Sequence, residues 1–219
     1  RPMHLLAARW VLPIAAPPLA DGAVLVASDG RIAWVGPRRD APAADTRVDD
    51  LGDAILLPGL VNAHTHLELT AFRGRLEMAD FLVWLRTLTR ARAEVLDDDA
   101  MRDAARLGVA EGLAAGVTTF ADTTSSGVSA DALAELGARG IVYQEVFGPD
   151  PAQREDALTG LRARVAALRA RVAAARAGDR VRIGVSPHAV YSVHEDLLLD
   201  ACAWAVGEDL PLAMHVSES

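Results

Sequence analysis

The sequence predicts an α/β protein in which a small all-β segment precedes a series of βα units. Two observations indicate this order. Short apolar runs separated by turns fill residues 1–57, and five further apolar runs alternate with alanine-rich stretches after residue 59. Alternation of strand and helix at this spacing is typical of a parallel sheet, either doubly wound or closed into a barrel. We therefore expect two domains, 1–57 and 58–219.

The N-terminal segment is expected to contain four short strands. Asp29-Gly30 is a strong hairpin signal between the second and the third. Residues 40–50 are polar and rich in alanine, which predicts a connection without regular structure. The expected strands are 5–12, 23–28, 31–35 and 54–57.

The second segment shows five βα units, whereas a complete eight-stranded barrel usually takes ~250 residues. Its expected strands are 60–65, 118–122, 141–147, 181–186 and 212–216. Its expected helices are 79–92, 98–115, 129–138, 151–177 and 195–208.

The charged residues of the chain exclude several chemistries. All 22 basic residues are Arg, against 30 acidic residues, for a net charge of −8. Without lysine, this segment can supply no Schiff base, no P-loop and no carbamylated-lysine metal bridge. An acidic chain is also a poor partner for nucleic acid or an anionic membrane, and no apolar run approaches the ~18 residues of a membrane span.

Cysteine usage indicates the compartment. The single cysteine, Cys202, excludes an internal disulfide and any zinc site built from several cysteines. It thereby excludes the His/Cys/Cys centre of the cytidine-deaminase fold. Arg9 and three prolines interrupt the one apolar run that resembles a signal peptide. We therefore expect a cytoplasmic protein.

A His-Thr-His sequence at the end of the first predicted βα strand is the most informative feature. In an extended segment His64 and His66 point to the same side, while Thr65 points away. The carboxyl end of a barrel strand is where active sites lie. Because imidazole is a good ligand for zinc or ferrous iron, the pair predicts half of a metal site.

Further histidines lie at the ends of two other predicted strands. His215 ends the last of them and could supply a third imidazole, and His188 could be a metal ligand or a partner of the substrate. Glu218 can approach the metal only if the chain has turned into a loop. A carboxylate placed there would take a proton from a metal-bound water and return it to the leaving nitrogen.

Several motifs together resemble a known family. They are Leu-Pro-Gly-Leu-Val-Asn-Ala-His-Thr-His at 57–66, Ser-Pro-His-Ala-x-Tyr-Ser at 186–192, and His-Val-Ser-Glu at 215–218. The sequence resembles the amidohydrolase superfamily. It is closest to the branch of deaminases and chlorohydrolases that act on adenosine-type and other aminated N-heterocycles.

The resemblance implies an architecture and a metal centre. It implies a (β/α)8 TIM-type barrel, of which five strands are present, and a small N-terminal β-sandwich element. It also implies one divalent metal ion, zinc in preference to iron, with His64, His66 and His215 as ligands. Glu218 would be the proton shuttle and His188 would contact the substrate. Because binuclear branches bridge two metals with a carbamylated lysine, the absence of lysine favours a single metal.

Three further residues are candidates for the substrate site, each with a structural alternative. Trp84 lies in a segment that resembles a lid, so it is expected either to form a pocket wall or to be a plain buried aromatic residue. Glu68 is expected to hydrogen-bond substrate, and Asp122 could do so too. Helix capping or satisfaction of a loop is the alternative role for both carboxylates.

The implied reaction is hydrolytic deamination, in which metal-bound hydroxide attacks a C–NH2 carbon and ammonia leaves. Aminofutalosine and adenosylhomocysteine or methylthioadenosine are the expected kinds of small-molecule substrate, and a homodimer is compatible with the resemblance. A chlorohydrolase or cyclic-amide hydrolase with the same site is one alternative. Since the family's strand-six histidine and strand-eight aspartate do not occur here, part of a longer enzyme is expected, with an inactive fragment as the other alternative.

Overall fold

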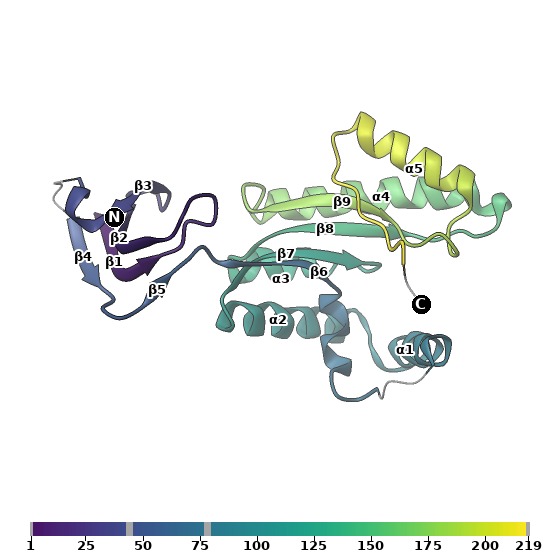
Figure 1. Cartoon of the computed structure of the whole chain (residues 1–219). Coiled ribbons are helices and arrows are strands. Elements are labelled where there is room, and N and C mark those ends of the chain that lie inside the picture. The colour runs from purple at the N-terminus through teal and green to yellow at the C-terminus, as the bar shows by residue number, and fades with distance from the viewer. Residues whose placement is uncertain (1, 43–45, 77–79, 218–219) are drawn as a thin grey trace. The chain divides into compact units, whose positions relative to one another are not determined.

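The computed structural model describes residues 2–42, 46–76 and 80–217. The chain divides into two compact units, Arg1–Gly59 and Leu60–Ser219 (Figure 1). None of the helices in the described ranges is long and apolar enough to cross a membrane.

The first unit is a five-stranded sheet with the order β3-β2-β1-β4, in which β5 also pairs with β1. Neighbours β1, β2 and β3 are antiparallel, whereas β4 and β5 run parallel to β1. Its buried core consists of Leu5, Ala7, Ala23 and Leu25. The strands are β1 (Met3–Val11), β2 (Leu19–Val26), β3 (Ile32–Pro37), β4 (Thr46–Asp50) and β5 (Ile55–Leu56).

Strand β4 corrects the expectation of an irregular connection over residues 40–50. Its sequence, Thr-Arg-Val-Asp-Asp, contains one apolar residue and gives no strand pattern. Backbone pairing with β1, from Met3 opposite Thr46 to Ala7 opposite Asp50, holds it in the sheet instead. The described residues of this unit form one sheet, so the β-sandwich stays a prediction.

The second unit contains a parallel sheet with the order β6-β7-β8-β9. This arrangement confirms the α/β class, while closure into a barrel stays a prediction. The strands are β6 (Leu60–Thr65), β7 (Val117–Thr124), β8 (Arg139–Val146) and β9 (Val181–Pro187).

The predicted fifth strand over 212–216 was wrong as a regular strand. Only isolated bridges join this segment to β9 and the turn after it, at Leu212 and His215. Pro211 directly precedes the segment and has no N–H to donate, although its carbonyl accepts from the Val185 N–H at 2.8 Å. The segment is nevertheless extended, and it follows β9 to its carboxyl end.

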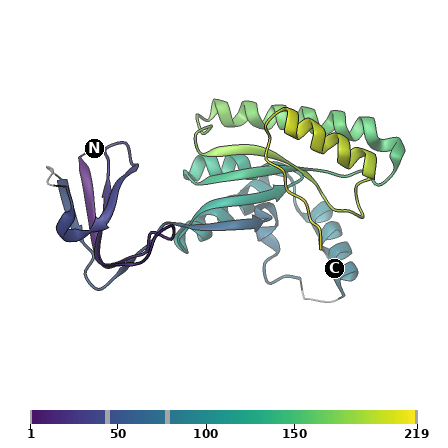
Figure 2. The same ribbon diagram turned by 45° about the horizontal axis from the view of Figure 1, so that its top comes forward.

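Within the described ranges, five α-helices connect or cover these strands. Asp80 begins the first of them by accepting the Leu82 N–H at 3.0 Å, and Asp97 begins the second by accepting the Ala100 N–H at 2.8 Å. Helices α4 and α5 lie side by side in both ribbon views (Figures 1 and 2). The helices are α1 (Phe81–Val95), α2 (Asp98–Ala114), α3 (Ser129–Leu136), α4 (Arg154–Ala174) and α5 (Glu195–Gly207). Short 3-10 helices are η1 (Arg38–Asp40), η2 (Leu67–Phe72) and η3 (Pro151–Gln153).

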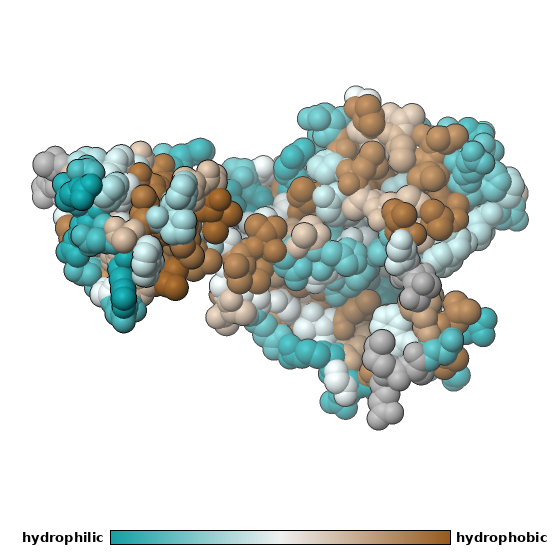
Figure 3. Space-filling model, in the orientation of Figure 1, coloured by the Kyte–Doolittle hydropathy of each residue, from teal (hydrophilic) through white to brown (hydrophobic). Residues whose placement is uncertain are grey.

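The core of the second unit lies between the sheet and its helices. Helix α4 buries one stripe at helical spacing and presents its arginines outward. The stripe consists of Leu161, Val165, Leu168 and Val172. Over the visible face of the molecule, hydrophilic and hydrophobic residues are mixed (Figure 3).

Candidate metal centre

Three imidazole rings converge at the carboxyl end of the parallel sheet. His64 lies in β6, His66 follows that strand, and His215 lies in the extended segment beside β9. Their ring centroids are 5.0 Å apart for His64–His66 and His64–His215, and 5.3 Å apart for His66–His215. One ligand nitrogen from each lies within 4.8 Å of the other two. Residues 149 positions apart in the chain thus meet at one point.

The spacing of these nitrogens fits a single metal ion. The Nε2 atoms of His66 and His215 are 3.3 Å apart. Two nitrogens that each lie about 2.0–2.1 Å from a common tetrahedral zinc ion are about 3.3–3.4 Å apart. The Nδ1–H of His215 donates to the backbone carbonyl of His188 at 2.9 Å, which leaves Nε2 as the ligand atom.

The protonation of His66 also suits a metal ligand. Its pKa is lowered to about 4, mainly by burial and also by the nearby His64 and His215 rings, which act as like charges. A hydrogen bond to the backbone of Thr123 acts in the opposite direction. At neutral pH the ring is therefore uncharged, and it can donate a lone pair to a cation.

A cavity of about 460 Å³ opens beside His66. Its wall includes three of the residues expected to face substrate, namely Glu68, Trp84 and His188. Phe147 and Tyr191 add aromatic surface to the same wall. A cavity with aromatic walls and a few polar groups suits a flat heterocyclic ligand.

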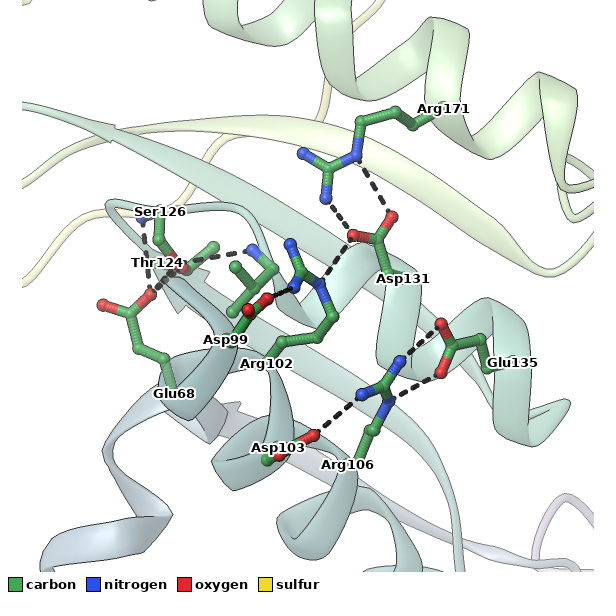
Figure 4. Close-up of polar contacts among 11 residues, drawn as sticks. Glu68, Asp99, Arg102, Asp103, Arg106, Thr124, Ser126, Asp131, Glu135 and Arg171 are labelled. Atoms are coloured by element: carbon green, nitrogen blue, oxygen red, sulfur yellow. Dashed lines mark hydrogen bonds and ion pairs between the residues drawn. The ribbon is translucent and has the colours of Figure 1, made fainter. Parts of the chain in front are cut away.

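Trp84 and Glu68 occupy different environments in this cavity. Trp84 lies on α1, where its ring is 6.3 Å from that of Phe81. The buried Glu68 carboxylate accepts from the Thr124 hydroxyl at 2.6 Å and pairs with Arg92 at 3.0 Å. The Ser126 hydroxyl also donates to it, as Figure 4 shows. These contacts favour the alternative role of Glu68 in satisfying the loop after β7.

His188 lies where β9 ends, next to the three-histidine cluster. Its ring centroid is 4.9 Å from that of His215 and 4.5 Å from that of Phe147. Its Nδ1 is 2.7 Å from the Ser192 hydroxyl, so the ring is oriented with Nε2 on the opposite side. Glu218, the expected proton shuttle, lies outside the described residues.

Of two buried carboxyl groups near the site, Glu145 was not assigned to it from the sequence, whereas Asp122 was a candidate. Glu145 at the end of β8 is 6% exposed, and its Oε1 is 4.0 Å from His188 Nε2. A charged residue within the apolar 141–147 run was the signal that could have identified it. Asp122 on β7 is fully buried and accepts the Leu67 N–H at 2.7 Å, which fits the satisfaction of a loop. Burial raises its pKa to about 8.

Comparisons with known proteins show that the chain is similar to several deaminases. The 5-methylthioadenosine/S-adenosylhomocysteine deaminase of Nitratidesulfovibrio vulgaris is 38% identical over 209 residues, covering 91% of this chain and 45% of the relative. The 5'-deoxyadenosine deaminase of Methanothermobacter thermautotrophicus is 33% identical over 199 residues, covering 90% and 45%. The chain thus spans about half the length of the curated relatives it matches.

Among solved structures, too, the chain is similar to deaminases. An adenosine deaminase from Xanthomonas campestris with bound zinc has a TM-score of 0.79 and 28% identity, covering 97% of this chain and 48% of that one. Helicobacter pylori aminofutalosine deaminase, with a TM-score of 0.82, 20% identity and coverage of 97% and 50%, shares the fold. The model of the amidohydrolase family matches residues 55–219. The chain belongs to the amidohydrolase family.

Proposed function

We propose that the protein containing this chain binds one divalent metal ion and hydrolytically deaminates an adenosine-type substrate. The observation that carries the proposal is the 3.3 Å spacing of the His66 and His215 Nε2 atoms beside a cavity that His66 itself lines. Zinc is the metal we propose, because the related adenosine deaminase from Xanthomonas campestris holds zinc.

Each group would have a separate task. His64, His66 and His215 would hold the metal, which when bound lowers the pKa of a coordinated water and so supplies a nucleophile at neutral pH. His188 would hydrogen-bond the heterocycle from the end of β9. Trp84 would pack against the ring from α1.

The proposed proton transfers involve a residue that lies outside the described part of the chain. We assign Glu218 as the shuttle that carries the proton of the water to the leaving nitrogen. Overall, water adds to the carbon that bears the amino group, the C–N bond breaks, and ammonia leaves with an oxo ring as the second product. The four parallel strands would be the first of a (β/α)8 barrel, and residues 1–57 would belong to a β-sandwich.

The names of the relatives support an adenosine-type nucleoside. Methylthioadenosine, S-adenosylhomocysteine, 5'-deoxyadenosine and aminofutalosine occur in those names and share an aminated purine. Atrazine chlorohydrolase from Arthrobacter aurescens shares the fold at 24% identity, with a TM-score of 0.80 and coverage of 98% and 53%. Hydrolytic displacement of chloride is therefore the competing reaction that the experiments must distinguish from deamination.

Metal content tests the proposed centre. We expect one equivalent of zinc per chain, and at least a tenfold weaker zinc affinity in His66→Ala and His215→Ala, measured by competition with a chromophoric chelator. His194→Asn is the matched control, because His194 lies at the start of α5 and its ring accepts the Asp196 N–H. Undiminished zinc binding in both alanine variants would sink the assignment of the ligands.

Ammonia release tests the reaction. We expect the zinc-loaded protein to release ammonia from adenosine, 5'-deoxyadenosine or methylthioadenosine, measured with a coupled assay. Absence of ammonia from all three, together with chloride release from a chlorinated heterocycle, would contradict deamination.

A further inference from the structure

The Glu145 carboxylate is a further polar group of the cavity, and it lies close to the proposed metal centre. It lies at the end of β8, lines the same cavity as His66 and His188, and is 6% exposed. Its ligand atoms and those of His188 and His215 lie within 4.8 Å of one another. The carboxylate also lies 4.0 Å from the Nε2 atom of His188, so it stands among the imidazoles at the reacting end of the cavity.

A second metal ion is a poor explanation for this cluster. His215 would have to serve both groups of ligands, yet its Nδ1–H donates to the His188 carbonyl at 2.9 Å. Its remaining nitrogen, Nε2, already lies 3.3 Å from His66 Nε2, at the spacing of two ligands of one ion. One lone pair binds one metal, so Glu145 lies outside the ligand set of the proposed ion, and it lines the cavity beside it.

We propose that Glu145 is a substrate-positioning residue that selects an amino group over a halogen on the heterocycle. The proposal rests on the proposed deaminase function. The carboxylate accepts an N–H from the amino group of the heterocycle, while His188 hydrogen-bonds a neighbouring atom of the same ring. The 4.0 Å between Glu145 Oε1 and His188 Nε2 is too long for a direct hydrogen bond, so both atoms can contact one ligand edge.

The selectivity follows from the chemistry of the two leaving groups. An ionised carboxylate can only accept hydrogen bonds, and an amino group offers two N–H donors. Hydrogen bonds to a charged acceptor are roughly twice as strong as neutral ones. Chlorine has no hydrogen to donate, and its lone pairs would face the carboxylate. Glu145 therefore favours loss of ammonia over loss of chloride from the same ring.

A paired-substrate experiment tests this inference. Adenosine and 6-chloropurine riboside differ only at the leaving group, and each reacts with water to release ammonia or chloride. In Glu145→Gln and Glu145→Ala we expect the ratio of kcat/KM for the amino substrate to that for the chloro substrate to fall at least tenfold. The exposed Glu155→Gln on the first turn of α4 is the matched control and should keep the wild-type ratio.

Binding and stability measurements separate this role from a structural one. A structural defect would lower kcat/KM for both substrates by the same factor and would lower Tm. A positioning role would instead change the ratio of the two kcat/KM values. Calorimetric Kd values for the two nucleosides should show the same loss of preference in the Glu145 variants. If the wild type releases ammonia but its ratio is unchanged in both variants, the inference is overturned and the deaminase function stands. If the wild type neither binds nor deaminates adenosine, both fail.

Discussion

At the scale of single residues, Asp122 is an example of burial that controls protonation. One oxygen of its fully buried carboxyl accepts the Leu67 N–H, and the other has no hydrogen-bond partner among the described residues. Burial raises the pKa of Asp122 from 3.8 to about 8, although the Ser129 hydroxyl and the Leu67 N–H act to lower it. The folded protein therefore holds a proton on Asp122 at neutral pH.

The stability of the metal-free chain should reflect that proton. Because the pKa is raised on folding, the folded state binds more protons than the unfolded state between pH 3.8 and about 8, and this contribution to stability is lost as pH rises through that range. Asp122→Asn keeps the acceptor for Leu67 and cannot ionise. We expect the variant to be more stable than wild type at pH 8, with less difference at pH 5, in urea unfolding. Equal differences at both pH values would contradict this account.

At the scale of elements, helix α4 is held by its apolar stripe and by ion pairs at its surface. Arg171 on α4 pairs with Asp131 on α3, and Asp131 also lies 3.8 Å from Arg102 on α2 (Figure 4). These groups are partly exposed, and such pairs contribute about 0–1 kcal/mol each. The buried stripe is therefore the larger contribution to the docking of the helix.

Truncation within the stripe tests this balance. Leu161 is fully buried, so Leu161→Ala should lower the free energy of unfolding by about 2–5 kcal/mol. The same change at Leu199 on α5, which is 60% exposed, should cost less than about 0.5 kcal/mol. Chemical denaturation of the two variants provides the comparison. A similar loss in both would mean that α4 is not docked through this stripe.

The elements also show how far the sequence could predict the fold and the site. Apolar strands and alanine-rich helices have strong periodic patterns, and β6 to β9 and the α4 stripe were predicted from them. Strand β4 has no such pattern, because backbone pairing with β1 and the contact of Asp49 with His4 hold it in the sheet. Likewise, motif spacing indicated the histidines, whereas the burial of Glu145 and its distance from His188 depend on the tertiary fold.

At the scale of the whole molecule, the proposed metal centre should link ligand binding to global stability. A ligand that binds only the folded state stabilises it, by about 2.7 kcal/mol at a hundredfold excess over Kd. Adding zinc should raise Tm in a concentration-dependent manner, and EDTA should reverse the rise. The His66→Ala variant should show little of this effect, and a zinc-induced rise of equal size in that variant would contradict the proposed ligands.

The distance along the chain between the proposed ligands suggests a second way in which the metal would stabilise the fold. His66 and His215 are separated by 149 positions, and strands β7 to β9 and helices α1 to α5 lie between them. An ion that joins both rings would close a loop of that length, as a cross-link does, and closing a long loop restricts the unfolded chain more than closing a short one. The metal would then stabilise the packing of the βα units as well as serve as a cofactor. Loss of the ion would therefore weaken the association of β9 with the extended segment beside it.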